Sequence, residues 1–142
     1  MNVNFRMALT GLALVASIGV VACNETPTTP TTTVTTTDLF FVSQLMPLGV
    51  TSRSFKVAKA GEVKVLFTSL LPESSGVVSV ALGTFDGTAC TPTNAVAVAA
   101  GSTTPIITTT LAAGDYCVRI ADTGVLTRTN DFSITVTIPS GS

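Results

Sequence analysis

The sequence has no histidine and no tryptophan, and it has a single tyrosine. Without histidine it cannot form the Ser-His or Cys-His pair on which much nucleophilic catalysis depends. A closed zinc site also lacks its usual ligands, because zinc is held mainly by histidine and cysteine. The shortage of large aromatic rings argues against a platform on which sugars stack. These absences favour a protein that is not an enzyme and that holds no cofactor or metal.

Charge is also scarce, since only 11% of the residues are charged and the formal net charge is −1. The chain has no run of basic residues, so nothing predicts a face that would bind nucleic acid. It also lacks a Gly-x-Ser-x-Gly elbow and a glycine-rich phosphate loop. The sequence therefore has no motif for hydrolysis by such an elbow, for nucleotide binding or for nucleic-acid recognition.

The first feature that is present is a targeting segment. Residues 1–22 carry one positive charge at Arg6, which is followed by an apolar run that ends at Ala22. This is the layout of a signal peptide. The run is shorter than the roughly 20 apolar residues that a membrane-spanning helix needs, and small residues close it. We therefore expect residues 1–22 to be cleaved from the mature protein.

The signal segment ends in Val20-Val21-Ala22-Cys23, which resembles the lipobox of bacterial lipoproteins. The resemblance implies that Cys23 becomes the mature N-terminus and carries diacylglycerol through a thioether, with further fatty acid such as palmitate. Several acyl chains hold a protein at a membrane far more firmly than one. Asn24, rather than aspartate, follows the cysteine, which favours the outer membrane in a host with two membranes. The alternatives are ordinary secretory cleavage that leaves Cys23 as a plain thiol, and an uncleaved apolar helix.

The cysteine count agrees with this interpretation. An odd number of thiols in an exported protein needs an explanation, and the chain has three. If Cys23 carries lipid, Cys90 and Cys117 form a pair that would persist as a disulfide in an oxidising compartment. A metal site or a reactive thiol is the alternative for these two residues. The pair lies 27 positions apart, so a disulfide would stabilise the fold by about 3 to 4 kcal/mol.

Residues 23–37 are predicted to form a linker that starts at the lipid-carrying cysteine. Threonine dominates this stretch, and Pro27 and Pro30 remove backbone donors from it. Such a composition has no apolar periodicity and cannot build a core. Fully extended, residues 24–37 would reach on the order of 40 Å. The linker would thus lift residues 38–142 away from the lipid headgroups.

From Asp38 onward apolar and polar residues alternate, and glycine and proline recur at short intervals. This pattern is typical of half-buried β-strands. The segments that show it are 39–46, 52–57, 62–67, 78–82, 95–100, 106–111, 116–121 and 132–138. Seven to nine short strands over about a hundred residues predict an all-β fold, a single antiparallel β-sandwich of jelly-roll-like type.

The strand at 116–121 also predicts where the disulfide lies. If Tyr116, Val118 and Ile120 point inward, the period of two sends Cys117 outward. The disulfide should then clip the loop at 87–94 onto the outer face of a sheet. An inward Cys117 would mean that this register is wrong by one residue.

The strand sequences support a family resemblance. Residues 111–120, which read LAAGDYCVRI, and the closing strand at 132–136 resemble the end of bacterial pre-peptidase C-terminal domains. Residues 54–57 and 61–65 also fit, so the likeness spans most of residues 38–140. It implies a jelly-roll-like β-sandwich of the kind found on secreted enzymes and surface proteins, itself non-catalytic. This sequence differs from that family in its expected lipid anchor and disulfide, and no peptidase domain is expected beside the sandwich.

Two groups of carboxylates are candidate sites. Asp122-Thr123-Gly124 is the tripeptide of aspartic proteases, but only 18 residues follow it, too few for the second half of such an enzyme. An Asp and a Gly that shape a turn are the simpler interpretation. A calcium hypothesis rests on four aspartates near predicted loops. Without an Asp-x-Asp-x-Asp loop, solvated turn carboxylates are the favoured alternative. The four residues are Asp86, Asp115, Asp122 and Asp131.

Three hypotheses for function follow. The first is a structural or binding module at the cell envelope, attached to the membrane through lipid on Cys23, whose partner is a protein or surface ligand that the sequence does not identify. The second is self-assembly into a surface array or filament, in which residues 39–46 pair with the sheet edge of a neighbour. The adjacent Phe40 and Phe41 are relevant to this second hypothesis, because in a strand one of them must face outward. That side chain belongs either to a partly covered edge or to a contact surface. The third is an enzyme of unknown type, whose activity would depend on Asp122.

Overall fold

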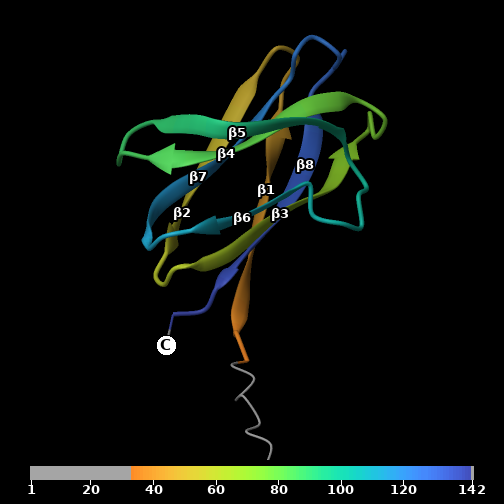
Figure 1. Cartoon of the computed structure of the whole chain (residues 1–142). Coiled ribbons are helices and arrows are strands. Elements are labelled where there is room, and N and C mark those ends of the chain that lie inside the picture. The colour runs from red at the N-terminus through yellow and green to blue at the C-terminus, as the bar shows by residue number, and fades with distance from the viewer. Residues whose placement is uncertain (1–32, 142) are drawn as a thin grey trace, which may run out of the picture. The chain divides into compact units, whose positions relative to one another are not determined.

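Eight β-strands and no helix account for the regular structure of residues 33–141, the part of the chain that the computed structural model describes (Figure 1). Cys23, the predicted signal peptide and most of the predicted linker lie outside the described residues. No helix within residues 33–141 is long and apolar enough to cross a membrane. The strands are β1 (Thr36–Leu45), β2 (Val50–Val57), β3 (Gly61–Leu71), β4 (Val77–Phe85), β5 (Cys90–Ala99), β6 (Ile107–Leu111), β7 (Gly114–Ala121) and β8 (Asn130–Pro139).

The strands form two four-stranded sheets, with the orders β1-β8-β3-β6 and β2-β7-β4-β5. Every pairing is antiparallel. Successive strands along the chain mostly alternate between the two sheets, which is the arrangement of a jelly roll. The predicted antiparallel β-sandwich is therefore confirmed, and each predicted strand segment corresponds to an observed strand.

The core lies between the two sheets, where every second side chain of the strands points inward. Its largest fully buried side chains include Phe67 of β3, Leu45 of β1 and Ile120 of β7. Each such side chain stabilises the fold by about 1.5 to 3 kcal/mol relative to an exposed position. The other buried members continue the alternation that the sequence shows. They include Val63, Val65, Leu70, Val78, Val80, Leu82, Val118, Phe132, Ile134 and Val136.

The adjacent phenylalanines of β1 face opposite sides, as the sequence predicts. Phe41 packs against the core, and its ring centroid lies 6.4 Å from that of Phe55. Phe55 in turn lies 6.2 Å from the ring of Tyr116. Phe40, on the outer face, is 74% exposed. Phe41 thus joins β1 to the second sheet, whereas Phe40 is left on the surface.

The sandwich begins earlier than the predicted boundary at Asp38, because β1 starts at Thr36. Thr36 and Thr37 pair with Pro139 and Ile138 of β8. The backbone N–H of Ser140 donates to the carbonyl of Thr35 at 2.9 Å. The β-branched threonines at the end of the linker favour extended backbone, so they continue the sheet. The chain consequently enters and leaves the sandwich at the same end (Figure 1).

Candidate functional site

Cys90 and Cys117 form a disulfide, as predicted, with their Cα atoms 5.8 Å apart. Cys90 belongs to β5 and Cys117 to β7, and these two strands flank β4 on opposite sides. Direct neighbours in a sheet lie about 4.8 Å apart, so two strands separated by a third are normally about twice as far from each other. The start of β5 must therefore bend across β4 to bring the two sulfurs together.

Gly83 of β4 makes this crossing possible. The β4–β5 pairing shifts register between Leu82 and Gly83. A Cβ atom at Gly83 would lie 2.1 Å from the carbonyl oxygen of Thr91 and 2.7 Å from the Cα atom of Pro92. No side chain fits into that space, so the backbone of β5 can rest directly on the outer face of β4 only because residue 83 is glycine.

The crossing also explains the burial of Cys117. Its side chain is 0% exposed, yet it lies outside the core cluster that contains Val118 and Ile120. Cys117 therefore points outward, as predicted, and the predicted register is correct. One detail was wrong, since Cys90 begins strand β5 and does not sit within a loop at 87–94. The disulfide therefore joins β5 to β7, and the start of β5 covers Cys117.

Asp122 holds the turns at the end of the sandwich opposite to the chain termini. It is 6% exposed. One carboxylate oxygen accepts the N–H of Leu48 at 2.8 Å, and the other accepts the N–H groups of Val125 and Leu126 at 2.9 and 3.2 Å. Gly124 has a φ of 98°, which glycine adopts without strain. These contacts show that Asp122-Thr123-Gly124 shapes a turn between β7 and β8.

The same contacts set the ionisation of Asp122. Burial alone would raise its pKa, but the backbone N–H groups of Leu48, Val125, Leu126 and Gly124 outweigh that effect and lower the pKa. The charged carboxylate is therefore the form that the folded protein prefers. It serves as an acceptor for the backbone rather than as an acid for chemistry.

Replacing Asp122 with asparagine should lower the free energy of unfolding at pH 7 by about 1.5 to 3 kcal/mol, because an amide nitrogen would then face the N–H of Leu48. The folded pKa of Asp122 lies below the unfolded value. Its stabilising contribution is therefore complete above about pH 4 and is lost as the pH falls through the folded pKa. Urea denaturation should show a larger difference between wild type and variant at pH 7 than near pH 3.

Asp115→Asn is the matched control for that experiment, because Asp115 is exposed and no hydrogen bond to its carboxylate is found within residues 33–141. Its stability should equal that of the wild type at both pH values. A loss in Asp122→Asn that is the same at both pH values would contradict the assignment.

At the same end of the sandwich as Asp122, Glu73 and Asn130 form a set of hydrogen bonds between two loops, here called the clasp. The sequence pattern does not reveal it. The carboxylate of Glu73 accepts the Nδ2 group of Asn130 at 2.8 Å, and the N–H and hydroxyl of Thr127. The Oδ1 atom of Asn130, which is fully buried, accepts the N–H of Glu73 at 2.7 Å. The hydrogen bonds from Thr127 and Asn130 lower the pKa of Glu73. The clasp joins the β3–β4 loop to the β7–β8 loop.

The four aspartates of the calcium hypothesis are not brought together. Asp122 is committed to the turn, and Asp131 accepts a hydrogen bond from Gln44 at 3.0 Å. Asp86 caps the β4–β5 turn by accepting the N–H groups of Thr88 and Ala89 at 2.8 and 2.7 Å, which lower its pKa. Asp86 shares a surface hollow of about 520 Å³ with Asp115, but Lys56 lines it as well. Within residues 33–141 no three acidic or thiol side chains converge as metal ligands.

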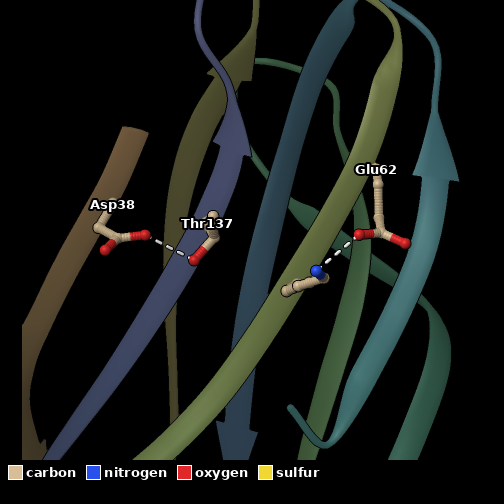
Figure 2. A network of polar contacts seen from close by, with 4 residues as sticks. Asp38, Glu62 and Thr137 are labelled. Atoms are coloured by element: carbon tan, nitrogen blue, oxygen red, sulfur yellow. Dashed lines mark hydrogen bonds and ion pairs between the residues drawn. The ribbon is translucent and has the colours of Figure 1, made fainter. Parts of the chain in front are cut away.

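A larger hollow of about 700 Å³ lies where the chain enters the sandwich. Figure 2 shows the polar contacts beside it: Asp38 accepts the hydroxyl of Thr137 at 2.6 Å, and the amine of Lys64 lies 2.7 Å from the carboxylate of Glu62. The two charged side chains are about half exposed, so their ion pair contributes little stability. The charged residues of its wall are Lys59, Lys64 and Glu62, two positive and one negative, and Lys64 is paired with Glu62.

The turn between β1 and β2 is unusual in being both apolar and exposed. Leu48 is 76% exposed and adopts a φ of 57°, a conformation that leucine rarely takes. Its N–H is held by Asp122, and a Cβ atom at Gly124 would lie 3.4 Å from its Cδ2 atom. Met46, Val50 and Val125 add further exposed apolar surface around it. The structure thus fixes an apolar tip on the loops that are far from the chain termini.

No family model matches the sequence, and no curated protein matches it. Two solved structures are similar to the chain in fold. The crystal structure of a mitogen derived from Yersinia pseudotuberculosis aligns over 75% of this chain and 89% of its own, with 10% identity and a TM-score of 0.51. The Bacillus endospore appendages, which form a novel family of disulfide-linked pili, align over 76% of this chain and 89% of theirs, with 13% identity and a TM-score of 0.40. At 10% identity the likeness to the mitogen supports the fold and nothing about function.

Proposed function

We propose that this protein is a lipoprotein whose β-sandwich is held outside the cytoplasm by lipid on Cys23 and has a structural or binding role at the cell envelope. The observation that carries the proposal is the distribution of the cysteines. Cys90 and Cys117 are paired with each other, which leaves Cys23 as the odd cysteine, at the end of a signal-like segment and within a lipobox-like sequence. A disulfide of this kind persists in oxidising compartments, which supports export.

The geometry of the sandwich is compatible with such an anchor. Strand β1 begins at Thr36, within the last residues of the threonine-rich tract, so a linker that starts at Cys23 would enter the sandwich at one end. The apolar tip around Leu48 belongs to loops at the opposite end. The tip is therefore separate from the point where the linker enters, and a protein or surface ligand could contact it.

We further propose that the role is not catalytic. Asp122, the carboxylate of the protease-like tripeptide, is occupied by backbone N–H groups. The resemblance to pre-peptidase C-terminal domains, which are themselves non-catalytic, supports the same proposal. We expect the sandwich to show no hydrolytic activity that depends on Asp122. If any activity is measured, Asp122→Asn should lower it only in proportion to the folded protein that is lost.

Replacing Cys23 with alanine tests the anchor, because the alanine side chain has no sulfur to form the thioether. The wild-type protein should fractionate with membranes and should be released by detergent but not by high salt. The Cys23→Ala variant should lose lipidation, and whatever fraction is exported should be soluble. Thr26→Ala, a neighbouring change outside the lipobox, should behave like the wild type. A Cys23→Ala variant that has lost residues 1–22 and still remains as firmly attached as the wild type would contradict the proposal.

A further inference from the structure

Strand β1 is an edge strand, and its free edge is unusually regular. It pairs with β8 alone, and ten consecutive residue pairs run from Thr36↔Pro139 to Leu45↔Asn130 without a bulge. An edge strand exposes one row of unpaired backbone groups, which form a template for another strand.

The residues whose backbone faces this edge can be identified. The bond from the N–H of Ser140 to the carbonyl of Thr35 makes this pair a hydrogen-bonded one. Hydrogen-bonded and non-bonded pairs alternate in antiparallel sheets, so Thr36, Asp38, Phe40 and Val42 direct their N–H and C=O groups away from β8. Pro139, which has no N–H, sits opposite Thr36 in a non-bonded pair, as this alternation requires.

The upper limit of the open edge is also defined. Gln44 has the same parity, but its carbonyl already accepts the hydroxyl of Thr51 at 3.2 Å. Phe40 is 74% exposed and Val42 is 68% exposed. Asp38, Phe40 and Val42 thus lie in the middle of the open row, and the side chains of Phe40 and Val42 are exposed and apolar.

The other three edges carry features that hinder strand addition. Strand β2 carries Arg53 and Lys56, and β6 has only five residues. Strand β5 carries Pro92 beside a register shift. Charges, prolines, bulges and short length are the usual means by which proteins protect sheet edges. Strand β1 has no lysine, arginine or proline, so it is the edge that this fold leaves open.

We propose that β1 pairs antiparallel with β1 of a second copy of this chain, with Phe40 opposite Phe40. In that register Asp38 lies opposite Val42 in both halves, so Asp38, Phe40 and Val42 of each copy are hydrogen-bonded, and Thr36 lies opposite Gln44. Centring the pair on Phe41 would instead place Thr36 opposite Met46, beyond the end of β1 at Leu45. The pairing is self-complementary, as a two-fold dimer interface requires.

Charge is compatible with this pairing as well. Asp38 is the only charged residue of β1, and the proposed register keeps the two Asp38 carboxylates apart. Each Asp38 instead lies level with Val42 of the other copy. Val42 and Arg53 line one hollow of about 310 Å³ next to the edge. Arg53 has no ion-pair partner in the described chain, so the incoming carboxylate would supply one.

The pairing goes beyond the proposed function and does not depend on the anchor, although the two are compatible. The two Thr36 residues would lie about 26 Å apart along the strands, at about 3.3 Å per residue. Residues 24–35 would reach about 37 Å if extended at about 3.1 Å per residue. Two copies that pair through β1 could therefore both be anchored in one membrane.

Sedimentation of residues 24–142, which contain the whole sandwich and its core, tests the pairing without the lipid. The wild type should show a concentration-dependent equilibrium between monomer and dimer. Phe40→Lys places two lysines opposite each other at an exposed position and should raise the dissociation constant about 100-fold or more. Leu71→Lys, at another exposed apolar position, is the control and should dimerise like the wild type.

Oxidative cross-linking tests the register. Phe40→Cys should give a covalent dimer, because Cα atoms of a hydrogen-bonded pair lie about 5.5 Å apart and a disulfide can join them. Val42→Cys should not, since the two residues would be about 13 Å apart along the strands. A wild type that stays monomeric at every concentration would overturn the proposal. Equal dissociation by Phe40→Lys and Leu71→Lys, or cross-linking through Val42→Cys alone, would overturn it as well.

Discussion

Removing the Cys90–Cys117 disulfide is expected to lower the free energy of unfolding by about 3 to 4 kcal/mol. The bond closes a loop between residues 27 positions apart, and without it the unfolded chain regains the conformations that the closed loop forbids. Urea denaturation of residues 24–142 with both cysteines replaced by alanine would measure the loss. The same double variant is the control for reductant, which should destabilise the wild type and leave the variant unchanged. A loss well under 1 kcal/mol would show that the bond does not carry the stability assigned to it.

Gly83→Ala is expected to be the most damaging glycine-to-alanine substitution within residues 33–141. Its Cβ atom would lie 2.1 Å from the Thr91 carbonyl oxygen, and backbone cannot move aside as a flexible side chain can. Overpacking of this kind costs about 1 to 3 kcal/mol, and here the shift of β5 would also pull Cys90 away from Cys117. We therefore expect a loss of about 3 kcal/mol and slower formation of the disulfide.

Gly114→Ala is the matched control for Gly83→Ala. A Cβ atom at Gly114 would make ordinary contacts with the ring of Tyr116, the nearest at 3.4 Å. This variant should keep nearly all of the wild-type stability in the same urea titration. Comparable losses in the two variants would mean that the crossing of β5 over β4 is not what requires glycine at residue 83.

The strands could be predicted because each one is half buried. Val63, Val65 and Phe67 of β3 recur at every second position and are fully buried in the core, whereas Glu62, Lys64 and Leu66 between them are not. The same period places Val118 and Ile120 inward and Cys117 outward. The start of β1 was harder to predict, because Thr36 and Thr37 look like the preceding linker and belong to the sheet only through their partners in β8.

The features that escaped prediction depend on contacts between distant segments. The burial of Cys117 results from β5 crossing over Gly83, and no local pattern reveals that crossing. The clasp between Glu73 and Asn130 joins loops that are 57 residues apart in sequence. The free edge of β1 likewise follows from the order of the strands in the sheet. Hydrophobic periodicity shows which face of a strand is buried, but it does not show which strand lies at an edge.

Among the candidate site residues, the cysteine pair and the Asp122 turn were predicted from residue type and count. Cys90 and Cys117 were the two thiols left once Cys23 was assigned to lipid, and they are bonded. An aspartate followed two residues later by a glycine is typical of a turn, and the Asp122 carboxylate does accept backbone N–H groups of that turn. The aspartates of the calcium hypothesis were near predicted loops, but those loops lie at different places on the sandwich. Proximity to a loop in the sequence was not enough to bring them together.

Mass spectrometry of the mature N-terminus tests the central proposal most directly. The account predicts that the membrane-bound protein begins at Cys23 and that its first residue carries diacylglycerol and further fatty acid on the thioether-linked cysteine. The Cys90–Cys117 disulfide should be intact in the same sample. A mature protein with an unmodified Cys23 thiol, or one that still contains residues 1–22, would contradict the account.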